Sequence, residues 1–360
     1  MPEGKVYVAY AVIAVVCLLI GAAIGHYVVP PPTKVEYVTT TPEPLYEVKI
    51  GMITAYFEAN LPVLVAIANG YFDEERVKVE IVSFKGGSEI RKALIAGEID
   101  FGAQSSAHAG IAQNAGADLR LILATFELST IDILVRSELK DQIKTLADLK
   151  GKKIGVTRFG SLTWVMANKY VSMAGLDPEK DVTIVEVGAD PAAIASALKA
   201  GEIDVYMGWT IITYKMQKEG IAYPLLNILD PTQHSKYVGP ICLEAGITTM
   251  GSTADNNPDL VCRVVSAIKK ALIFIATHTP EEIVDVILGN DVTAEFAALS
   301  REDLLGMLQL MMSGFSKDGT ISKTGWEYGP YNQLVKFIPE KFKPVDFEKA
   351  CDIRYAGMKE

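Results

Sequence analysis

One short pattern occurs twice in this chain. "ALIAGEIDFG" runs from Ala93 to Gly102, and "ALKAGEIDVYMG" runs from Ala197 to Gly208. In each copy a helix end, a glycine stop and a strand start follow one another. The copies lie much further apart than the roughly 20 to 50 residues of a solenoid repeat. The pattern therefore predicts two similarly built α/β halves.

Length and composition are those of a globular protein. With 360 residues, of which 49% are hydrophobic and 22% charged, the chain can bury a large core and form more than one compact unit. The formal net charge of -10 argues against electrostatic binding of nucleic acid. The cysteines and histidines are too scattered for a Cys/His metal site, so we expect no metal and no cofactor. Whether two of Cys242, Cys262 and Cys351 form a disulfide stays open.

The first part of the chain differs from the rest. Val6 to Val29 contains no Asp, Glu, Lys or Arg, and at about 1.5 Å per residue it can cross a hydrocarbon core. Small residues at 21–25 leave a cleaved signal as the alternative. We expect a transmembrane anchor or signal segment at residues 1–29. A Pro/Thr-rich stalk at residues 30–44 then presents the body at the cell surface or in a periplasm-equivalent space.

From Tyr46 onward, short runs rich in Val and Ile alternate with longer helical patterns. This alternation is typical of βαβ units and a mostly parallel sheet. In the first half, Asn60 and Ser88 are the predicted helix caps, and Gly97 ends the second helix. The predicted strands cover residues 47–53, 77–84, 100–104 and 119–126.

The second half repeats this order. Ser161 and Asp190 are the predicted helix caps, Pro191 is the first helical residue after Asp190, and Gly201 ends that helix. The predicted strands cover residues 153–157, 183–187 and 204–207. Further along, the sequence predicts a strand at 241–248 and helices at 258–277, 280–288, 300–313 and 326–337.

The acids of the repeat invite a catalytic interpretation. Glu98 and Asp100 in the first copy, and Glu202 and Asp204 in the second, could be paired carboxylates. Turns at helix C-terminal ends, however, lie at the sheet edge opposite the ligand crevice. We expect these four side chains to be solvated turn acids.

Several stretches resemble type II periplasmic substrate-binding proteins of ABC importers, in the group for sulfonates, nitrate, taurine and thiamine-pyrimidine precursors. The matching stretches are "ANGYFDEERVKVEIVSFKGGSEIRKALIAGEIDFGAQSS", "TLADLKGKKIGVTRFGS" and "ALKAGEIDVYMGW". The resemblance covers most of the chain from Tyr46, and its most specific part is "DLKGKKIGV" with a Gly-Ser turn between the two AGEID copies. The chain departs from the family in lacking a lipobox and in the length of its anchor.

The resemblance implies two Rossmann-like lobes joined by a two-strand hinge. Lobe 1 would comprise residues 45–130 plus 238–360, and lobe 2 residues 131–237. The lobes would close on a small molecule and deliver it to the permease and ATPase subunits of an importer.

Ligands of open parallel sheets bind beyond the carboxyl ends of the strands, where helix starts point outward. The loops at those ends supply the candidate ligand-binding residues. They are Tyr56, Phe57, Glu58, Lys85, Gly87, Ser88, Gln104, Ser105, Ser106, Arg158, Gly160, Ser161, Thr163, Asp190, Trp209 and Thr210. For each of them a plain role as turn glycine, helix cap or core aromatic is the alternative.

The candidates carry both charges. Arg158 and Lys85 can pair with a sulfonate or carboxylate, and Glu58 and Asp190 can receive an amino group or ring nitrogen. Trp209 is the best-placed aromatic for stacking. We expect a monoanionic or zwitterionic organic ligand such as a sulfonate or taurine, with a heterocycle as the second choice.

Two classes of function fit this sequence. No nucleophile, base and orienting group stand together, Ser161 lacks a GxSxG setting, and His108 is the one histidine near a candidate loop. We therefore expect a binding protein without chemistry. The alternative is an enzyme on the same scaffold that acts on a pyrimidine-like or aromatic metabolite.

Overall fold

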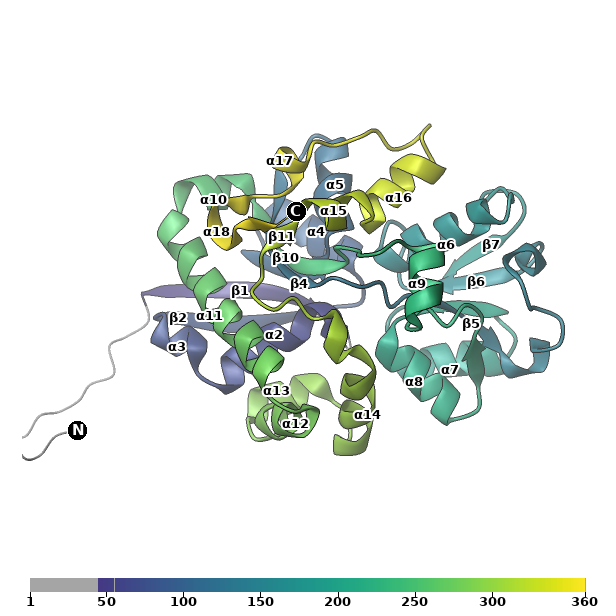
Figure 1. Ribbon diagram of the computed structural model, residues 1–360, viewed down its shortest axis with the longest axis horizontal. Helices are drawn as coiled ribbons and strands as arrows, with labels where there is room; N and C mark the ends of the chain where they lie inside the picture. The colour runs from purple at the N-terminus through teal and green to yellow at the C-terminus, as the bar shows by residue number, and fades with distance from the viewer. Residues whose placement is uncertain (1–44, 55, 360) are drawn as a thin grey trace, which may run out of the picture. The chain divides into compact units, whose positions relative to one another are not determined.

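The computed structural model describes residues 45–54 and 56–359. The predicted anchor at 1–29 and stalk at 30–44 lie outside these residues. Within the described part, no helix is both long and apolar enough to cross a membrane. Two five-stranded sheets, each packed with helices, confirm the predicted α/β class (Figure 1).

The first sheet has the strand order β2-β1-β3-β10-β4. β1 is parallel to β2 and β3, whereas β10 is antiparallel to both β3 and β4. Its strands are β1 (Tyr46–Ile53), β2 (Val77–Phe84), β3 (Phe101–Ser105), β4 (Leu119–Phe126) and β10 (Ala245–Met250).

The second sheet has the equivalent order β7-β6-β8-β5-β9. β6 is parallel to β7 and β8, and β5 is antiparallel to β8 and β9. Its strands are β5 (Asp132–Arg136), β6 (Lys153–Val156), β7 (Thr183–Glu186), β8 (Val205–Gly208) and β9 (Ala222–Pro224). β5 thus fills the place in this sheet that β10 fills in the first.

Two segments join the sheets. The first connection, residues 127–131, leads from β4 to β5, and the second connection, residues 238–244, leads from α9 (Pro231–Tyr237) to β10. The prediction of mostly parallel sheets is confirmed, because four of the five strands in each described sheet run in one direction, and β10 in the first sheet and β5 in the second run the opposite way. A strand that arrives from the other sheet needs no helical crossover within its own sheet, so it can run antiparallel to its neighbours.

The helix after β1 starts earlier than predicted. α2 (Phe57–Ala68) begins directly after Tyr56, and the predicted cap Asn60 lies inside it. The Asn60 amide instead donates to the carbonyl oxygen of Ile53 at 2.6 Å. Asn60 therefore ties the helix to the end of β1 and does not cap it.

The helix after β2 also starts earlier than predicted, by two residues. α4 (Gly87–Ala96) has Gly86 at its cap position, so the predicted cap Ser88 is a buried residue of the first turn. α3 (Tyr71–Glu74) and α5 (Ala107–Asn114) complete the helices between the first four strands. In both cases the helix begins within four residues of the strand end, so the predicted polar cap already lies inside the helix.

The caps of the second half are confirmed. Ser161 accepts the backbone N–H of Trp164 at the start of α6 (Leu162–Met173). Asp190 accepts that of Ala193 at the start of α7 (Pro191–Lys199). α8 (Thr210–Lys218) follows β8.

The two AGEID copies have the same backbone geometry. Gly97 and Gly201 both end their helices in the left-handed region, with φ of 71° and 68°. Ala93 and Leu94 in the first copy, and Ala197 and Leu198 in the second, are buried as predicted, whereas the alanines directly before the two glycines are exposed. Ile99 packs so closely over Gly51 of β1 that a Cβ there would lie 2.5 Å from its Cδ1 atom, and Ile203 leaves 2.6 Å over Gly155 of β6.

The acids of the two copies fall into two pairs. Glu98 and Glu202 are exposed, as predicted for turn acids. Asp100 and Asp204 correct that prediction, because their side chains are half-buried. Each accepts a backbone N–H of the neighbouring parallel strand, from Lys49 at 2.8 Å and from Lys153 at 2.9 Å, respectively.

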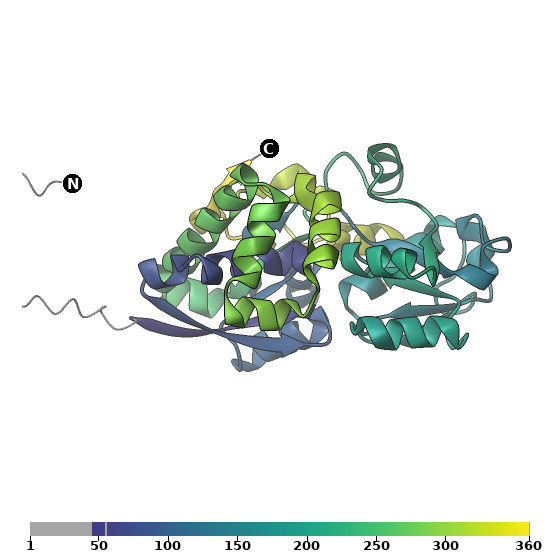
Figure 2. The ribbon, with the colours of Figure 1, turned by 90° about the horizontal axis from the view of Figure 1, so that it is seen from below.

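After β10 the chain is mostly helical, and its long helix α11 packs against α2 and α3 (Figures 1 and 2). The predicted strand 241–248 is displaced to β10, and the predicted helix 326–337 is two helices, separated by Gly329 at the cap of the second. The helices are α10 (Gly251–Asn256), α11 (Pro258–Thr277), α12 (Pro280–Leu288), α13 (Asp291–Ala297), α14 (Arg301–Met311), α15 (Lys323–Glu327), α16 (Pro330–Phe337), α17 (Phe347–Ala350) and α18 (Ile353–Ala356). β11 (Ile321–Ser322) and β12 (Met358–Lys359) form a small third sheet.

Candidate functional site

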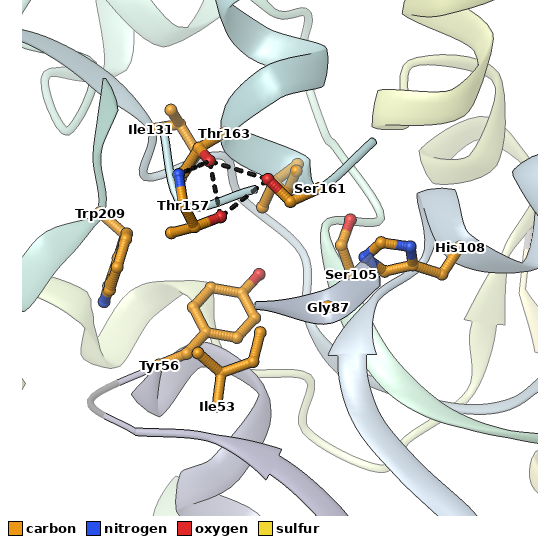
Figure 3. Close-up of a pocket in the computed structure, with 11 residues that line it drawn as sticks. Ile53, Tyr56, Gly87, Ser105, His108, Ile131, Thr157, Ser161, Thr163 and Trp209 are labelled. Carbon is orange, nitrogen blue, oxygen red and sulfur yellow. Dashed lines mark hydrogen bonds between the residues drawn. The ribbon is translucent and has the colours of Figure 1, made fainter. Parts of the chain in front are cut away.

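A cavity lies where the carboxyl ends of β1, β3, β6 and β8 approach one another (Figure 3). Its volume is about 320 Å³, part of which is open to solvent. Residues from both sheets and from the first connection contribute to it. The lining residues are Ile53, Tyr56, Gly87, Ser105, His108, Ile131, Thr157, Ser161, Leu162, Thr163 and Trp209.

Three hydroxyl groups form a cluster at the start of α6 (Figure 3). The Oγ1 atom of Thr157 donates to Oγ of Ser161 at 2.7 Å, and Oγ1 of Thr163 lies 2.9 Å from each of these two oxygens. All three side chains are buried. The first turn of a helix carries N–H groups without helical partners and the positive end of the helix dipole. The second half therefore presents an electropositive, hydroxyl-rich surface to the cavity.

Two aromatic rings form another part of the lining. Tyr56 and Trp209 meet edge to face, with ring centroids 6.3 Å apart and an interplanar angle of 89°. The Tyr56 hydroxyl is buried and has no hydrogen-bond partner among the described residues. In Figure 3 it points toward the hydroxyl cluster. Burial raises the pKa of Tyr56 well above its usual value, so the hydroxyl keeps its proton and can donate it to a ligand.

His108 lines the cavity but is not among the predicted ligand-binding residues. Its Nδ1 atom lies 2.7 Å from Nη1 of Arg91. Burial, and then the charge of Arg91, hold the pKa of His108 well below its usual value, so the ring is neutral. Its place in the first turn of the helix that follows a predicted strand is the sequence signal that could have identified it.

Six of the predicted residues line the cavity, and the others lie elsewhere. The six are Tyr56, Gly87, Ser105, Ser161, Thr163 and Trp209. Those outside the lining are Phe57, Glu58, Lys85, Ser88, Gln104, Ser106, Arg158, Gly160, Asp190 and Thr210. Sequence reasoning missed Ile53, His108, Ile131, Thr157 and Leu162, most of which are apolar residues or strand ends.

The predicted cations do not reach the cavity. Nε of Arg158 donates to Oε1 of Glu89 at 2.9 Å, and its Nη1 donates to the Thr157 carbonyl at 2.9 Å. Lys85 is exposed. Arg158 thus joins the loop after β6 to α4 of the other half.

The predicted acid Glu58 is fully buried beside the cavity, not in its lining. Its Oε1 atom accepts from the hydroxyl of Thr130 at 2.7 Å and from that of Thr210 at 2.8 Å. The hydroxyl of Thr130 also lies 3.2 Å from Oε1 of Glu244. One hydroxyl hydrogen cannot serve two carboxylates, so one of these carboxyl groups carries a proton.

Burial and the nearby charge of Glu58 raise the pKa of Glu244 to about 8. Burial also raises the pKa of Glu58. With its pKa at about 8, Glu244 holds its proton at neutral pH, and the Thr130 hydroxyl beside it donates to Glu58. These contacts link the first connection, the second connection, α2 and α8.

Comparison with known proteins supplies the family. The model of the family described as "NMT1/THI5 like" matches residues 59–283. A putative aliphatic sulfonates-binding protein of Bacillus subtilis is 28% identical over 66% of this chain and 68% of its own length. The taurine-binding periplasmic protein of Escherichia coli is 28% identical over 48% of this chain and 52% of its own length.

Solved structures share the fold of this chain. A protein from Bordetella bronchiseptica superimposes with a TM-score of 0.76 at 25% identity, covering 86% of this chain and 95% of its own. The alkanesulfonate-binding protein SsuA from Xanthomonas axonopodis pv. citri, bound to MOPS, has a TM-score of 0.59 at 22% identity and covers 75% of this chain and 85% of its own. The predicted resemblance is thus confirmed, and the chain belongs to the NMT1/THI5-like family.

Proposed function

We propose that the protein is the extracytoplasmic solute-binding component of an ABC importer and that it captures a small organic sulfonate. The observation that carries this proposal is a cavity rich in hydrogen-bond donors but without charged side chains among its described lining residues. A singly charged oxyanion can be held by such donors together with a helix start. A doubly charged anion needs cations, which this lining does not supply.

The rest of the cavity suits an organic tail. Ile53, Ile131 and Leu162 are apolar, and the rings of Tyr56 and Trp209 add flat surfaces. A zwitterion such as taurine also needs an acceptor for its ammonium group. The buried acid Glu58 already accepts from two threonine hydroxyls outside the lining. We therefore rank alkane- and arylsulfonates above taurine.

Capture occurs by closure of two lobes, with residues 45–130 plus 238–360 as lobe 1, residues 131–237 as lobe 2, and the two connections as hinge. Contacts between the halves outside the cavity support a closed arrangement. They include Glu89 with Arg158, and Lys218 with Glu302 and Asp303 on α14. Closure buries the ligand and presents one shape to the permease, with which the ATPase subunits would act.

Binding without turnover is favoured over an enzyme on this scaffold. The ring nitrogen of His108 that could act as a base faces Arg91, which only donates hydrogen bonds. The hydroxyls of Ser161 and its neighbours bond to one another and to no base among the described residues. Predicted attachment through residues 1–29 also fits a receptor at the cell surface or in a periplasm-equivalent space.

A thermal-shift screen of the full chain tests this function. We expect butane-1-sulfonate or benzenesulfonate to raise the melting temperature more than taurine, nitrate or an aminopyrimidine. A ligand at a hundred times its Kd contributes about 2.7 kcal/mol to the free energy of unfolding. A shift with aminopyrimidines alone, or turnover of any of these compounds, would contradict the proposal.

A further inference from the structure

The Arg91 side chain contacts both halves of the protein. Its Nη1 atom lies 2.7 Å from Nδ1 of His108 and donates to the carbonyl oxygen of Gly160 at 3.2 Å. Arg91 belongs to α4 and His108 to α5, whereas Gly160 lies in the loop between β6 and α6 of the other half. Gly160 has a φ of 74°, a conformation in which glycine alone is unstrained. One guanidinium group therefore joins a cavity-lining side chain to the opposite half.

The contact with Arg91 fixes the tautomer of His108. A guanidinium group has five N–H donors and no acceptor, so Nδ1 of His108 must be the acceptor. The lowered pKa of this ring means that it carries a single hydrogen. That hydrogen must be on Nε2, and Nε2–H is a hydrogen-bond donor.

Nε2 is the end of the ring that faces the cavity. It lies so close to Gly87 that a Cβ on that residue would be 2.2 Å away, and Gly87 also lines the cavity. In Figure 3 the ring reaches in beside Ser105 and Gly87. Gly87 leaves room for His108 at this point, which any larger residue would obstruct.

We propose that Nε2–H of His108 is the specificity-determining donor to one oxygen of the ligand and that Arg91 is its positioning residue. The inference rests on the proposed function and deepens it, because it names the group that selects an oxyanion. A ligand must offer an acceptor at this point, so an ammonium or ring N–H is rejected there. When the two halves are together, the hydrogen bond to the Gly160 carbonyl fixes the Arg91 side chain in the position from which it contacts His108.

The first test is the tautomer in the ligand-free, full-length protein. The histidine ¹⁵N spectrum distinguishes a protonated from an unprotonated ring nitrogen, and the His108 signals are assigned by their loss in His108→Gln. We expect Nε2 protonated and Nδ1 unprotonated. In Arg91→Met, which keeps the aliphatic stem, we expect a mixture of tautomers. A His108 ring protonated at Nδ1, or at both nitrogens, in the wild-type protein would overturn the inference.

The second test is affinity for butane-1-sulfonate, measured by calorimetry. A hydrogen bond to a charged group corresponds to a roughly 10- to 100-fold change in Kd, so we expect His108→Leu to weaken binding by that factor. His108→Gln, whose amide can donate near the position of Nε2, should recover most of the loss. Arg91→Met should weaken binding by about tenfold, and Arg91→Lys by less.

A matched control is Arg136→Met. Arg136 lies against Gly201 at the far end of the second sheet, much as Arg91 lies against Gly160. We expect the Arg136→Met variant to bind butane-1-sulfonate with the same Kd as the wild type. If the wild type binds butane-1-sulfonate and both His108→Leu and Arg91→Met bind it equally well, the inference is wrong and the proposed function stands. If the wild type binds no sulfonate at all, the proposed function fails, while the spectrum still decides the role of Arg91.

Discussion

The two halves are alike at the sheet edge that carries the AGEID turns and differ at the sheet edge that lines the cavity. At the end that carries the AGEID repeat, both halves use the same contacts, with Asp100 and Asp204 accepting a strand N–H and Ile99 and Ile203 packing over a glycine. At the cavity end, the halves have little in common. At the turn from helix to strand, both halves therefore use the same backbone geometry and the same side-chain contacts. Where a ligand is bound, each half has its own side chains.

The difference at the cavity end is chemical. The first half supplies a neutral histidine, a tyrosine hydroxyl and Ser105, whereas the second supplies a cluster of hydroxyls at a helix start and an indole ring. The two halves thus complement each other around one ligand. Substitutions at the repeat should change stability without affinity, and those at the cavity should change affinity.

The largest effect is expected for Trp209→Ala. Loss of this ring should weaken binding of a sulfonate by about 100-fold, as for a buried aromatic anchor, and lower the free energy of unfolding by about 3 to 5 kcal/mol. Trp164→Ala on α6 is the control, because Trp164 packs on Phe342 and does not line the cavity. Calorimetry measures both, and equal affinities would remove Trp209 from the site.

The next effect tests the equivalence of the repeat. Gly51→Ala and Gly155→Ala each force a Cβ against an isoleucine side chain, and overpacking of this kind costs about 1 to 3 kcal/mol. The two losses of stability, measured by urea unfolding, should be similar, and the Kd for a sulfonate should not change. Strongly unequal losses would break the comparison between the two copies.

A pH-dependent effect is expected at the connections. Because the folded-state pKa of Glu244 is raised to about 8, its protonation stabilises the folded state at low pH, and this contribution is lost as pH rises through about 8. Glu244→Gln mimics the protonated form. Relative to wild type it should therefore gain stability as the pH rises from 6, by about 1.4 kcal/mol for each pH unit, and the gain should level off above pH 8. Urea unfolding of both proteins between pH 6 and about pH 9 measures this difference.

Other ionisable groups face this carboxyl group, so the comparison of variant with wild type is essential. They are Glu58, Cys242, Lys169, Tyr56 and Tyr170. The pKa of Lys169 is lowered to about 8, mainly by burial, and this favours the folded state at high pH, opposite to Glu244. A difference between Glu244→Gln and wild type that stays constant across this range would contradict the assigned proton.

The smallest effects concern the acids of the repeat. Asp100→Asn and Asp204→Asn each weaken an acceptor of a strand N–H and should cost about 1 kcal/mol of stability. Glu98→Gln and Glu202→Gln, on exposed side chains, should cost nothing measurable. None of the four should change the Kd for a sulfonate, and a weakened Kd in either Glu variant would reopen the catalytic interpretation of these acids.

The sequence predicted what depends on local chemistry. Ser161 and Asp190 are caps because a polar residue precedes a helix pattern without competition from the strand before it. Asn60 failed as a cap because its amide bonds to the end of β1. The α/β class and the repeated unit could likewise be inferred from periodicity and glycine positions.

The cavity could be predicted only in part, because its chemistry depends on contacts between the halves. Arg158 and Glu58 have the right charges for binding a ligand. In the structure, however, Arg158 donates to Glu89, and Glu58 accepts from two threonine hydroxyls. The role of His108 depends on Arg91, and no spacing in the sequence links the two side chains. The position of a residue at a strand end was enough to predict that it lies near the cavity. Its hydrogen-bond partners could be identified only from the three-dimensional structure.

The position of β10 has a consequence for how the protein is made. β10 lies between β3 and β4, so the first sheet stays split until residue 250 has been synthesised. Every strand of the second sheet lies within residues 132–224. On the ribosome, the second sheet can therefore be completed first, although it comes later in the chain. A product that terminates near residue 240 would leave the facing edges of β3 and β4 without their shared partner, a form prone to aggregation.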